Sequence, residues 1–331
     1  MARDPGRKGG STLVKGIIMN HGDISPEIAQ GLKVLQARIA NAKIPSSKLD
    51  ETLNIATWNI REFGKKARSA AAIHYIAEIL GQFDLISIAE LRDNLTDLGR
   101  VLDVLGPTWR VIYSDALRDS GGNNERVGFI YDKRAVAFSG FAATANPPRE
   151  KVGNLYLPKF DWWREPFMAS FSAGSFDFVL LAAHAQWGTP AGRLVELQSL
   201  AEWVDLKRKE KTCEDKDLII VGDFNIETPE QLAALTGKGL QMPAALEGKS
   251  FGTNLAQDKR YDQILHYPGY PQNFSNQAGV VDFYAGSSKE LFPDLDKLAF
   301  TFQMSDHLPL WMQINTDIEG QKLDEIIRAG K

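Results

Sequence analysis

The sequence predicts an α/β (α+β) protein in which helices lie outside two packed β-sheets. Short apolar runs rich in β-branched and aromatic residues recur between Leu53 and Ile314, which is the composition of β-strands. Some runs alternate with polar residues and others are apolar throughout, as expected when sheets are covered on one face or on both. With 331 residues, of which 44% are hydrophobic, the chain is long enough to bury a sizeable core.

A helical extension precedes the first strand. Ser25 is a candidate N-cap, Pro26 suits the first helical position, and apolar residues then recur at helical spacing. We therefore assign residues 1–50 to an N-terminal extension with one helix at about 25–43. The main domain spans residues 51–316, and residues 317–331 form a charged C-terminal tail.

The main domain alternates strands with a few helices. The apolar runs predict strands at residues 53–60, 84–91, 126–132, 167–173, 176–185, 217–226, 261–267 and 308–314. Helical periodicity predicts helices at residues 66–81, 94–105 and 191–211.

Composition excludes several classes of protein. A single cysteine, Cys213, excludes an intrachain disulfide and fits a reducing compartment. No apolar run reaches the roughly 18 residues of a membrane span, and the N-terminus lacks the apolar core of a signal peptide. We therefore expect a cytoplasmic protein without a membrane span. The net charge of −4 excludes neutralisation of nucleic acid over the whole surface, but it leaves room for a local basic groove.

Polar side chains stand at the ends of the expected strands. Taken singly, each is best explained as a turn residue or a buried, hydrogen-bonded histidine. Taken together, they supply hard oxygen ligands suited to Mg²⁺ or Mn²⁺ and two histidines suited to proton transfer. That combination fits the hydrolysis of a phosphate ester. The set comprises Asn59, Glu90, His184, Asp223, Asn225, Asp262, Asp306 and His307.

The motifs around these residues carry a family resemblance. GDFN at 222–225 and SDH at 305–307 are shared by the endonuclease/exonuclease/phosphatase superfamily, which the chain resembles from about residue 52 to residue 314. The RD after Glu90, the ER at 125–126, REPF at 164–167 and YDQI at 261–264 make it most similar to the deoxyribonuclease I branch.

The resemblance implies a four-layer αββα sandwich of two mixed, mostly antiparallel sheets, with the site at one edge. It places Glu90, Asn59 and Asp306 at metal-ligand positions. Further matches imply catalytic roles for His184, His307, Asp223, Glu125, Asp262 and Asn225. Arg92 and Arg164 match arginines that face nucleic acid, and Arg126 is a further basic residue suited to a phosphate backbone.

Two histidine–carboxylate pairs follow from this resemblance. The family pattern pairs His307 with Asp223 and His184 with Glu125. Our hypothesis is that the Asp223–His307 pair activates water and the Glu125–His184 pair serves the leaving group. Which histidine acts as the acid stays open at this point.

The departures from the family pattern affect residues expected to contact nucleic acid rather than residues expected to catalyse hydrolysis. Gln263 replaces an arginine, and SGGNN at 120–124 lacks an aromatic residue that enters the minor groove in deoxyribonuclease I. Trp162 and Trp163 suit either base stacking or core packing, with packing favoured. Trp187, three residues after His184, is the better stacking candidate.

The sequence therefore predicts a Mg²⁺- or Mn²⁺-dependent DNA endonuclease, with Ca²⁺ as a further ion to consider. A phosphatase or phospholipase-like phosphodiesterase acting on inositol phosphates or sphingomyelin is the main alternative. A catalytically inactive binding module is less favoured, because every expected catalytic position is occupied. No motif in the extension identifies a protein partner.

Overall fold

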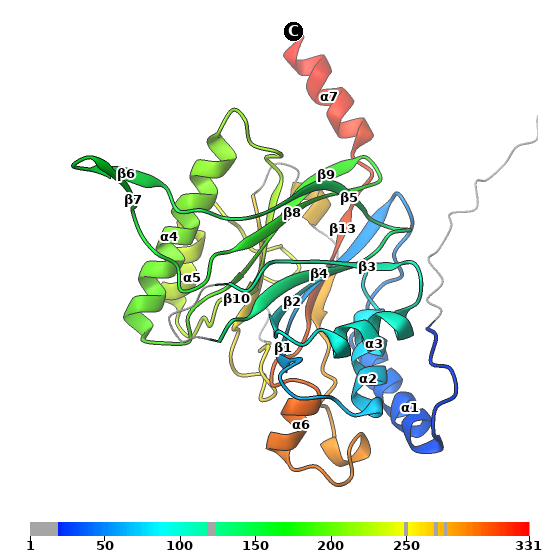
Figure 1. Ribbon diagram of the computed structural model, residues 1–331. Helices are drawn as coiled ribbons and strands as arrows, with labels where there is room; N and C mark the ends of the chain where they lie inside the picture. The colour runs from blue at the N-terminus through cyan, green and yellow to red at the C-terminus, as the bar shows by residue number, and fades with distance from the viewer. Residues whose placement is uncertain (1–18, 118–122, 248–250, 268–270, 275–276, 331) are drawn as a thin grey trace, which may run out of the picture.

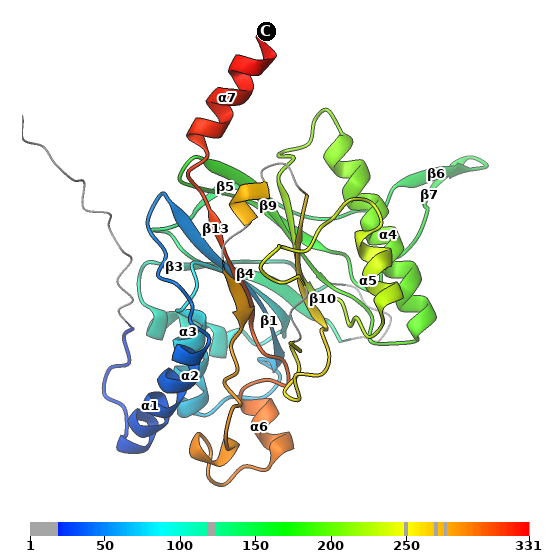
Figure 2. The same ribbon diagram turned by 180° about the vertical axis from the view of Figure 1, so that it is seen from behind.

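The computed structural model describes residues 19–117, 123–247, 251–267, 271–274 and 277–330. Two β-sheets pack face to face, and helices cover the outer face of each sheet (Figures 1 and 2). This arrangement confirms the predicted sandwich. No helix in these ranges is both long enough and apolar enough to cross a membrane.

The first sheet has six strands and is covered by the helices of the N-terminal half. Its strands β1 and β2 run parallel, while the other neighbours are antiparallel. The strand order is β12 (Ala278–Val280), β13 (Leu310–Asn315), β1 (Thr52–Phe63), β2 (Leu85–Leu91), β4 (Arg126–Asp132) and β3 (Trp109–Tyr113). The covering helices are α1 (Pro26–Asn41), α2 (Ala70–Leu80) and α3 (Thr96–Leu105).

The second sheet has five strands and is covered by two helices. Its strands β9 and β10 run parallel, and the other neighbours are antiparallel. The strand order is β11 (Asp262–His266), β10 (Leu218–Asp223), β9 (Phe176–His184), β8 (Phe167–Ala173) and β5 (Ala137–Thr144). The covering helices are α4 (Pro190–Lys209) and α5 (Pro229–Thr236).

Three hydrophobic clusters lie between the four layers. The middle cluster joins the inner faces of the two sheets and is rich in phenylalanine, with Phe129 stacked on Phe167 at 5.5 Å between ring centroids. The outer clusters join each sheet to its helices. Because each sheet has a hydrophobic cluster on both of its faces, most of the central strands are continuous apolar runs in the sequence.

The N-terminal extension packs on the main body through α1. The Ser25 hydroxyl caps the helix by accepting a hydrogen bond from the amide of Ile28, and Leu35 is fully buried. Buried Arg38 donates hydrogen bonds to the carbonyls of Phe283 and Ser287. These contacts attach the described part of the extension to α2 and to the segment before α6 (Lys297–Gln303).

Several elements were not predicted, and three of the strands among them lie at sheet edges. Strands β3, β5 and β12 are edge strands, so the apolar runs that mark central strands are weak or short there. The unpredicted hairpin of β6 (Arg149–Val152) and β7 (Leu155–Pro158) projects from the body (Figures 1 and 2). The charged C-terminal tail, for which one short helix was allowed, forms helix α7 (Glu319–Ala329). Two 3₁₀ turns, η1 (Pro271–Phe274) and η2 (Ser288–Glu290), complete the described elements.

The parallel pairs bring the expected site residues together. Because β1 and β2 run in the same direction, Asn59 and Glu90 emerge at the same edge of the first sheet. In the second sheet, Asp223 lies opposite His184 on β9 and opposite Asp262 on β11. The two edges face each other, so the polar ends of both sheets line one cavity.

Candidate active site

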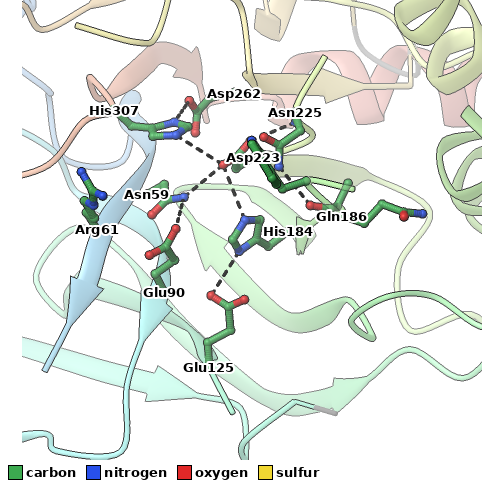
Figure 3. Close-up of polar contacts among 12 residues, drawn as sticks. Asn59, Arg61, Glu90, Glu125, His184, Gln186, Asp223, Asn225, Asp262 and His307 are labelled. Carbon is green, nitrogen blue, oxygen red and sulfur yellow. Dashed lines mark hydrogen bonds and ion pairs between the residues drawn. The ribbon is translucent and has the colours of Figure 1, made fainter. Parts of the chain in front are cut away.

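The carboxylate of Asp223 lies at the centre of the candidate site (Figure 3). Its Oδ2 accepts a hydrogen bond of 3.0 Å from Asn59 Nδ2. The same oxygen lies 3.6 Å from the Nε2 atoms of both His184 and His307. The side chain of Asp223 is almost fully buried, and its Oδ2 is shared by three groups, two from strands and one from a loop.

The backbone around Asp223 explains the GDFN motif. Gly222 has a φ of 137°, and a Cβ atom there would lie 1.9 Å from the carbonyl oxygen of Ala183 on β9, so only glycine fits. Asn225 adopts a left-handed φ of 50°, and its amide donates to Asp223 Oδ1 over 2.9 Å. Asn225 Nδ2 donates to the carbonyl of Ala185, which ties this turn to the end of β9. The strained turn therefore fixes the orientation of Asp223.

Each histidine is backed by a second carboxylate. His307 Nδ1 lies 2.8 Å from Asp262 Oδ2, and His184 Nδ1 lies 3.3 Å from Glu125 Oε2. The Glu125–His184 pair is as predicted. His307 also has its predicted partner, since Asp223 Oδ2 lies 3.6 Å from Nε2, but Asp262, which forms the hydrogen bond to Nδ1, was not predicted as a partner. The register of β10 and β11, which puts Asp262 beside Asp223, is the reason for this difference.

The carboxylates change the protonation of both imidazoles. Burial would lower the pKa of His307, but Asp262 and Asp223 raise that pKa to about 10. Burial would also lower the pKa of His184, and Arg164 acts in the same direction, yet Glu125 and Asp223 raise this pKa overall. His307 is therefore an imidazolium at neutral pH.

Asp223 itself remains ionised. Burial would raise its pKa, but His307 and His184 outweigh that effect and lower the pKa of the carboxyl. Burial opposes ionisation of Glu125 as well, and His184 with Arg164 lowers its pKa. The cavity thus contains the negative carboxylates of Asp223 and Glu125 beside the imidazolium of His307.

The first sheet contributes a group of oxygen atoms that suit a divalent cation. Glu90 accepts hydrogen bonds from Asn59 Nδ2 over 2.9 Å and from the amide of Glu62 over 2.8 Å. Asn59 Oδ1 is buried without a hydrogen-bond partner. A buried carbonyl oxygen left open beside a carboxylate is the donor set that Mg²⁺ and Mn²⁺ prefer.

Two groups of side chains have ligand atoms close enough to hold an ion. In one group, Glu90, Glu125 and His184 offer atoms within 4.8 Å of one another, and Asp223, Asp262 and His307 do so in the other. Asp306, predicted near the metal, lies at the mouth of the cavity with its side chain 43% exposed and ion-paired to Arg61 at 3.3 Å.

Of the three predicted arginines, the cavity wall includes two. Arg164 forms an ion pair with Glu125, and Arg92 donates to the carbonyl of Asn123. Arg126 is not among the residues that line the cavity and instead pairs with Asp93 at 3.0 Å. Arg126 is the first residue of β4, whereas Glu125 precedes that strand and lines the cavity.

The three tryptophans considered for base stacking differ in their exposure to solvent. Trp162 is buried and packs edge-on against Trp203, so core packing is the correct interpretation for it. Trp163 is half-buried. Trp187 lines the cavity and is 81% exposed. It therefore lies where the sequence placed its best stacking candidate.

Sequence reasoning missed part of the cavity wall. Glu62, Asn123 and Tyr261 line the cavity of about 440 Å³, although none was named as a site residue. Glu62 lies where the pairing of β1 with β2 shifts register, and no periodic pattern marks such a bulge. Gln263 is buried and donates to the carbonyl of Arg260. In the SGGNN stretch, residues 120–122 lie outside the described residues.

Comparisons with known proteins agree with this geometry. Residues 56–279 match the model of the Endonuclease/Exonuclease/phosphatase family. A deoxyribonuclease of Thioalkalivibrio sp. (strain K90mix) is 28% identical over 86% of this chain and 76% of its own length. Deoxyribonuclease-1 of Bos taurus is 27% identical over 80% of this chain and 92% of its own length.

Solved structures share the fold at low sequence identity. An endonuclease/exonuclease/phosphatase family protein of Bacteroides thetaiotaomicron has a TM-score of 0.55 and 17% identity, over 81% of this chain and 96% of its own. A truncated TDP2 of Caenorhabditis elegans has a TM-score of 0.54 and 14% identity, over 80% of this chain and 97% of its own.

Proposed function

We propose that this chain, which belongs to the endonuclease/exonuclease/phosphatase family, is a metal-dependent DNA endonuclease. Its family and its deoxyribonuclease relatives support a hydrolase that acts on phosphoesters. The observation that carries the proposal is the position of Asp223, whose Oδ2 lies 3.6 Å from the Nε2 atoms of two histidines. A carboxylate between two imidazoles can exchange protons with both of them.

The residues present fit a divalent cation. Asn59 Oδ1 and the carboxylate of Glu90 would hold Mg²⁺ or Mn²⁺, with Asp306 at the cavity mouth, and Ca²⁺ is a further ion to test. When bound, the ion would neutralise charge on the scissile phosphate. The carboxylates of the cavity would otherwise repel a phosphate.

Asp223 is the proton acceptor in the proposed reaction. Its lowered pKa keeps it ionised, so Asp223 takes a proton from the attacking water while His307 stays protonated beside it. The water oxygen then bonds to phosphorus. The charge of the His307 imidazolium, fixed by Asp262, stabilises the negative phosphate at this stage.

His184 completes the reaction on the other side. Its imidazolium, oriented by Glu125, donates the Nε2 proton to the leaving oxygen as the phosphorus–oxygen bond breaks. The proton held by Asp223 can then return to His184 across the 3.6 Å that separates them. The raised pKa of His184 supports its role as the acid, which the sequence alone left open.

The domain boundaries and the cellular location of the protein are also proposals. We assign catalysis to residues 51–316, with residues 1–50 as an extension and 317–331 as a tail. The contacts of α1 with α2 support an extension packed on the catalytic body. A cytoplasmic location remains a prediction from the single cysteine and the N-terminal sequence.

One panel of substrates tests the proposal. Supercoiled plasmid, linear duplex, single-stranded DNA, RNA and an inositol polyphosphate are incubated with the protein and Mg²⁺, then with Mn²⁺ or Ca²⁺ in its place. We expect nicking of plasmid that EDTA and Asp223→Asn both abolish. The matched control is Asp205→Asn, which changes a carboxylate on the surface of α4.

Other outcomes would contradict the proposal. Hydrolysis of the inositol compound alone would favour the phosphatase alternative. Cleavage that survives EDTA would contradict metal dependence, and inactivity on every substrate would favour a binding module.

A further inference from the structure

The most unusual side chain outside the catalytic network is Trp187. All seven tryptophans of the chain lie in the described residues, and Trp187 is 81% exposed. Trp58, Trp109, Trp162, Trp203 and Trp311 are buried, and Trp163 is half-buried. A large aromatic ring left in water at the rim of a polar cavity is a common feature of ligand sites.

The ring is exposed, but its backbone is held firmly. Arg193 of α4, which is buried, donates from Nη2 to the carbonyl of Trp187 over 2.8 Å and from Nε to the carbonyl of Gln186 over 3.1 Å. Glu196 accepts from the amide of Gln186 over 2.9 Å. Buried Arg193 and Glu196 therefore hold the backbone of the Trp187 loop, while the indole ring itself stays exposed to solvent.

The same arginine connects this loop to the catalytic turn. Arg193 Nη1 donates to the carbonyl of Asn225 over 2.8 Å and to Glu227 Oε2 over 2.7 Å. Asn225 in turn binds Asp223 through its backbone amide. The position of the Trp187 loop is therefore set relative to Asp223 by a short chain of buried hydrogen bonds.

From this arrangement we infer that Trp187 is a platform on which a nucleobase beside the scissile phosphate stacks, and that the preferred substrate is single-stranded DNA. A tryptophan can stack only on a base whose face is free, and the bases of an intact duplex already stack on one another. The cavity next to Trp187 offers the imidazoles and arginines that suit a phosphate, and the exposed ring offers the apolar surface that suits a base. This inference rests on the proposed phosphodiester chemistry and adds a preference for unpaired strands.

The first test is a binding measurement without cleavage. Protein that carries Asp223→Asn, and so does not cleave, is titrated in Mg²⁺ with a ten-nucleotide thymidine oligomer while tryptophan fluorescence and its quenching by acrylamide are recorded. Because Trp187 is the exposed indole, we expect saturating oligomer to remove about half of the acrylamide-accessible signal. Stacking of one base contributes roughly 1–3 kcal/mol, so Trp187→Ala should weaken binding about 5- to 150-fold. Trp187→Phe, which keeps an aromatic face, should stay within about threefold of wild type.

Controls separate stacking from general effects. Val195→Ala alters an exposed apolar side chain of the neighbouring helix α4, and this variant should bind the oligomer with unchanged affinity. A blunt duplex of the same length should protect Trp187 much less than the single strand. Equal protection by both, or an unchanged affinity in Trp187→Ala, would overturn the inference.

A cleavage assay distinguishes this inference from the proposed function. With Mg²⁺, Trp187→Ala should lower kcat/KM on the single strand at least about fivefold and change the duplex value less than twofold. Cleavage that Trp187→Ala leaves unchanged on both substrates would overturn the inference while the proposed function stands. Quenching by the oligomer without any cleavage would contradict the proposed function and support the binding role of Trp187.

Discussion

The two halves of the cavity hold histidines in the same relation to Asp223, yet their surroundings differ. Behind His307 lies Asp262, with its Oδ2 2.8 Å from Nδ1. Behind His184 lies Glu125, which also forms an ion pair with Arg164. The arginine competes for the carboxylate and repels the imidazolium, so His184 is the histidine better placed to release a proton during the reaction.

The largest expected effect comes from removing either imidazole. General acid–base groups contribute about 10²- to 10⁴-fold to rates, so His184→Ala and His307→Ala should each lower kcat at least about 10³-fold on plasmid. His74→Asn, on α2 and outside the cavity, is the control and should stay within about twofold. Retention of most activity in His184→Ala would show that the two-histidine scheme is wrong.

The carboxylates behind the histidines should differ in their effect on stability. Glu125→Gln would remove the carboxylate that forms an ion pair with the buried guanidinium of Arg164, and arginine cannot lose its charge, so the free energy of unfolding should fall by about 3 kcal/mol or more. Asp262→Asn should cost less, about 1–2 kcal/mol, because His307 can release its proton. Urea denaturation at pH 7 measures both values.

A surface carboxylate gives the baseline for this comparison. Asp205 pairs with Arg208 and Lys209 on α4, and Asp205→Asn should change the free energy of unfolding by less than about 1 kcal/mol. An equal loss of stability in Glu125→Gln and Asp262→Asn would show that Arg164 is not what distinguishes the two halves.

The fold was predictable because its central strands are buried on both faces. Runs such as those ending at His184 and Asp223 are apolar throughout and mark the middle of the second sheet. Edge strands carry a weaker pattern, and exposed, alternating β5 was missed for this reason. The expected helix at 66–81 begins at Ala70, because Ser69 caps it by accepting from the amide of Ala72.

The identity of the site residues and both histidine–carboxylate pairs were predictable, but the second partner of His307 was not. Strand ends placed Asn59, Glu90 and Asp223 at one edge, and the structure has them within hydrogen-bond reach. The partner of His307 depends on the register between β10 and β11, which a single sequence does not specify. Arg126 was predicted beside the phosphate, but it is the first residue of β4 and does not line the cavity.

Arg126 should therefore show the smallest effect. Its guanidinium pairs with Asp93 at 3.0 Å, while Arg164 on the opposite side of Glu125 lines the cavity. We expect Arg126→Ala to keep kcat/KM within about twofold, whereas Arg164→Ala should lose at least tenfold because Glu125 would no longer be fixed behind His184. The salt dependence of DNA binding tests whether Arg126 contacts a phosphate, because each phosphate contact adds about 0.9 to the slope of log affinity against log salt concentration. An unchanged slope in Arg126→Ala would show that Arg126 does not contact a phosphate. A slope lowered by about one would show that it does, as the sequence predicted.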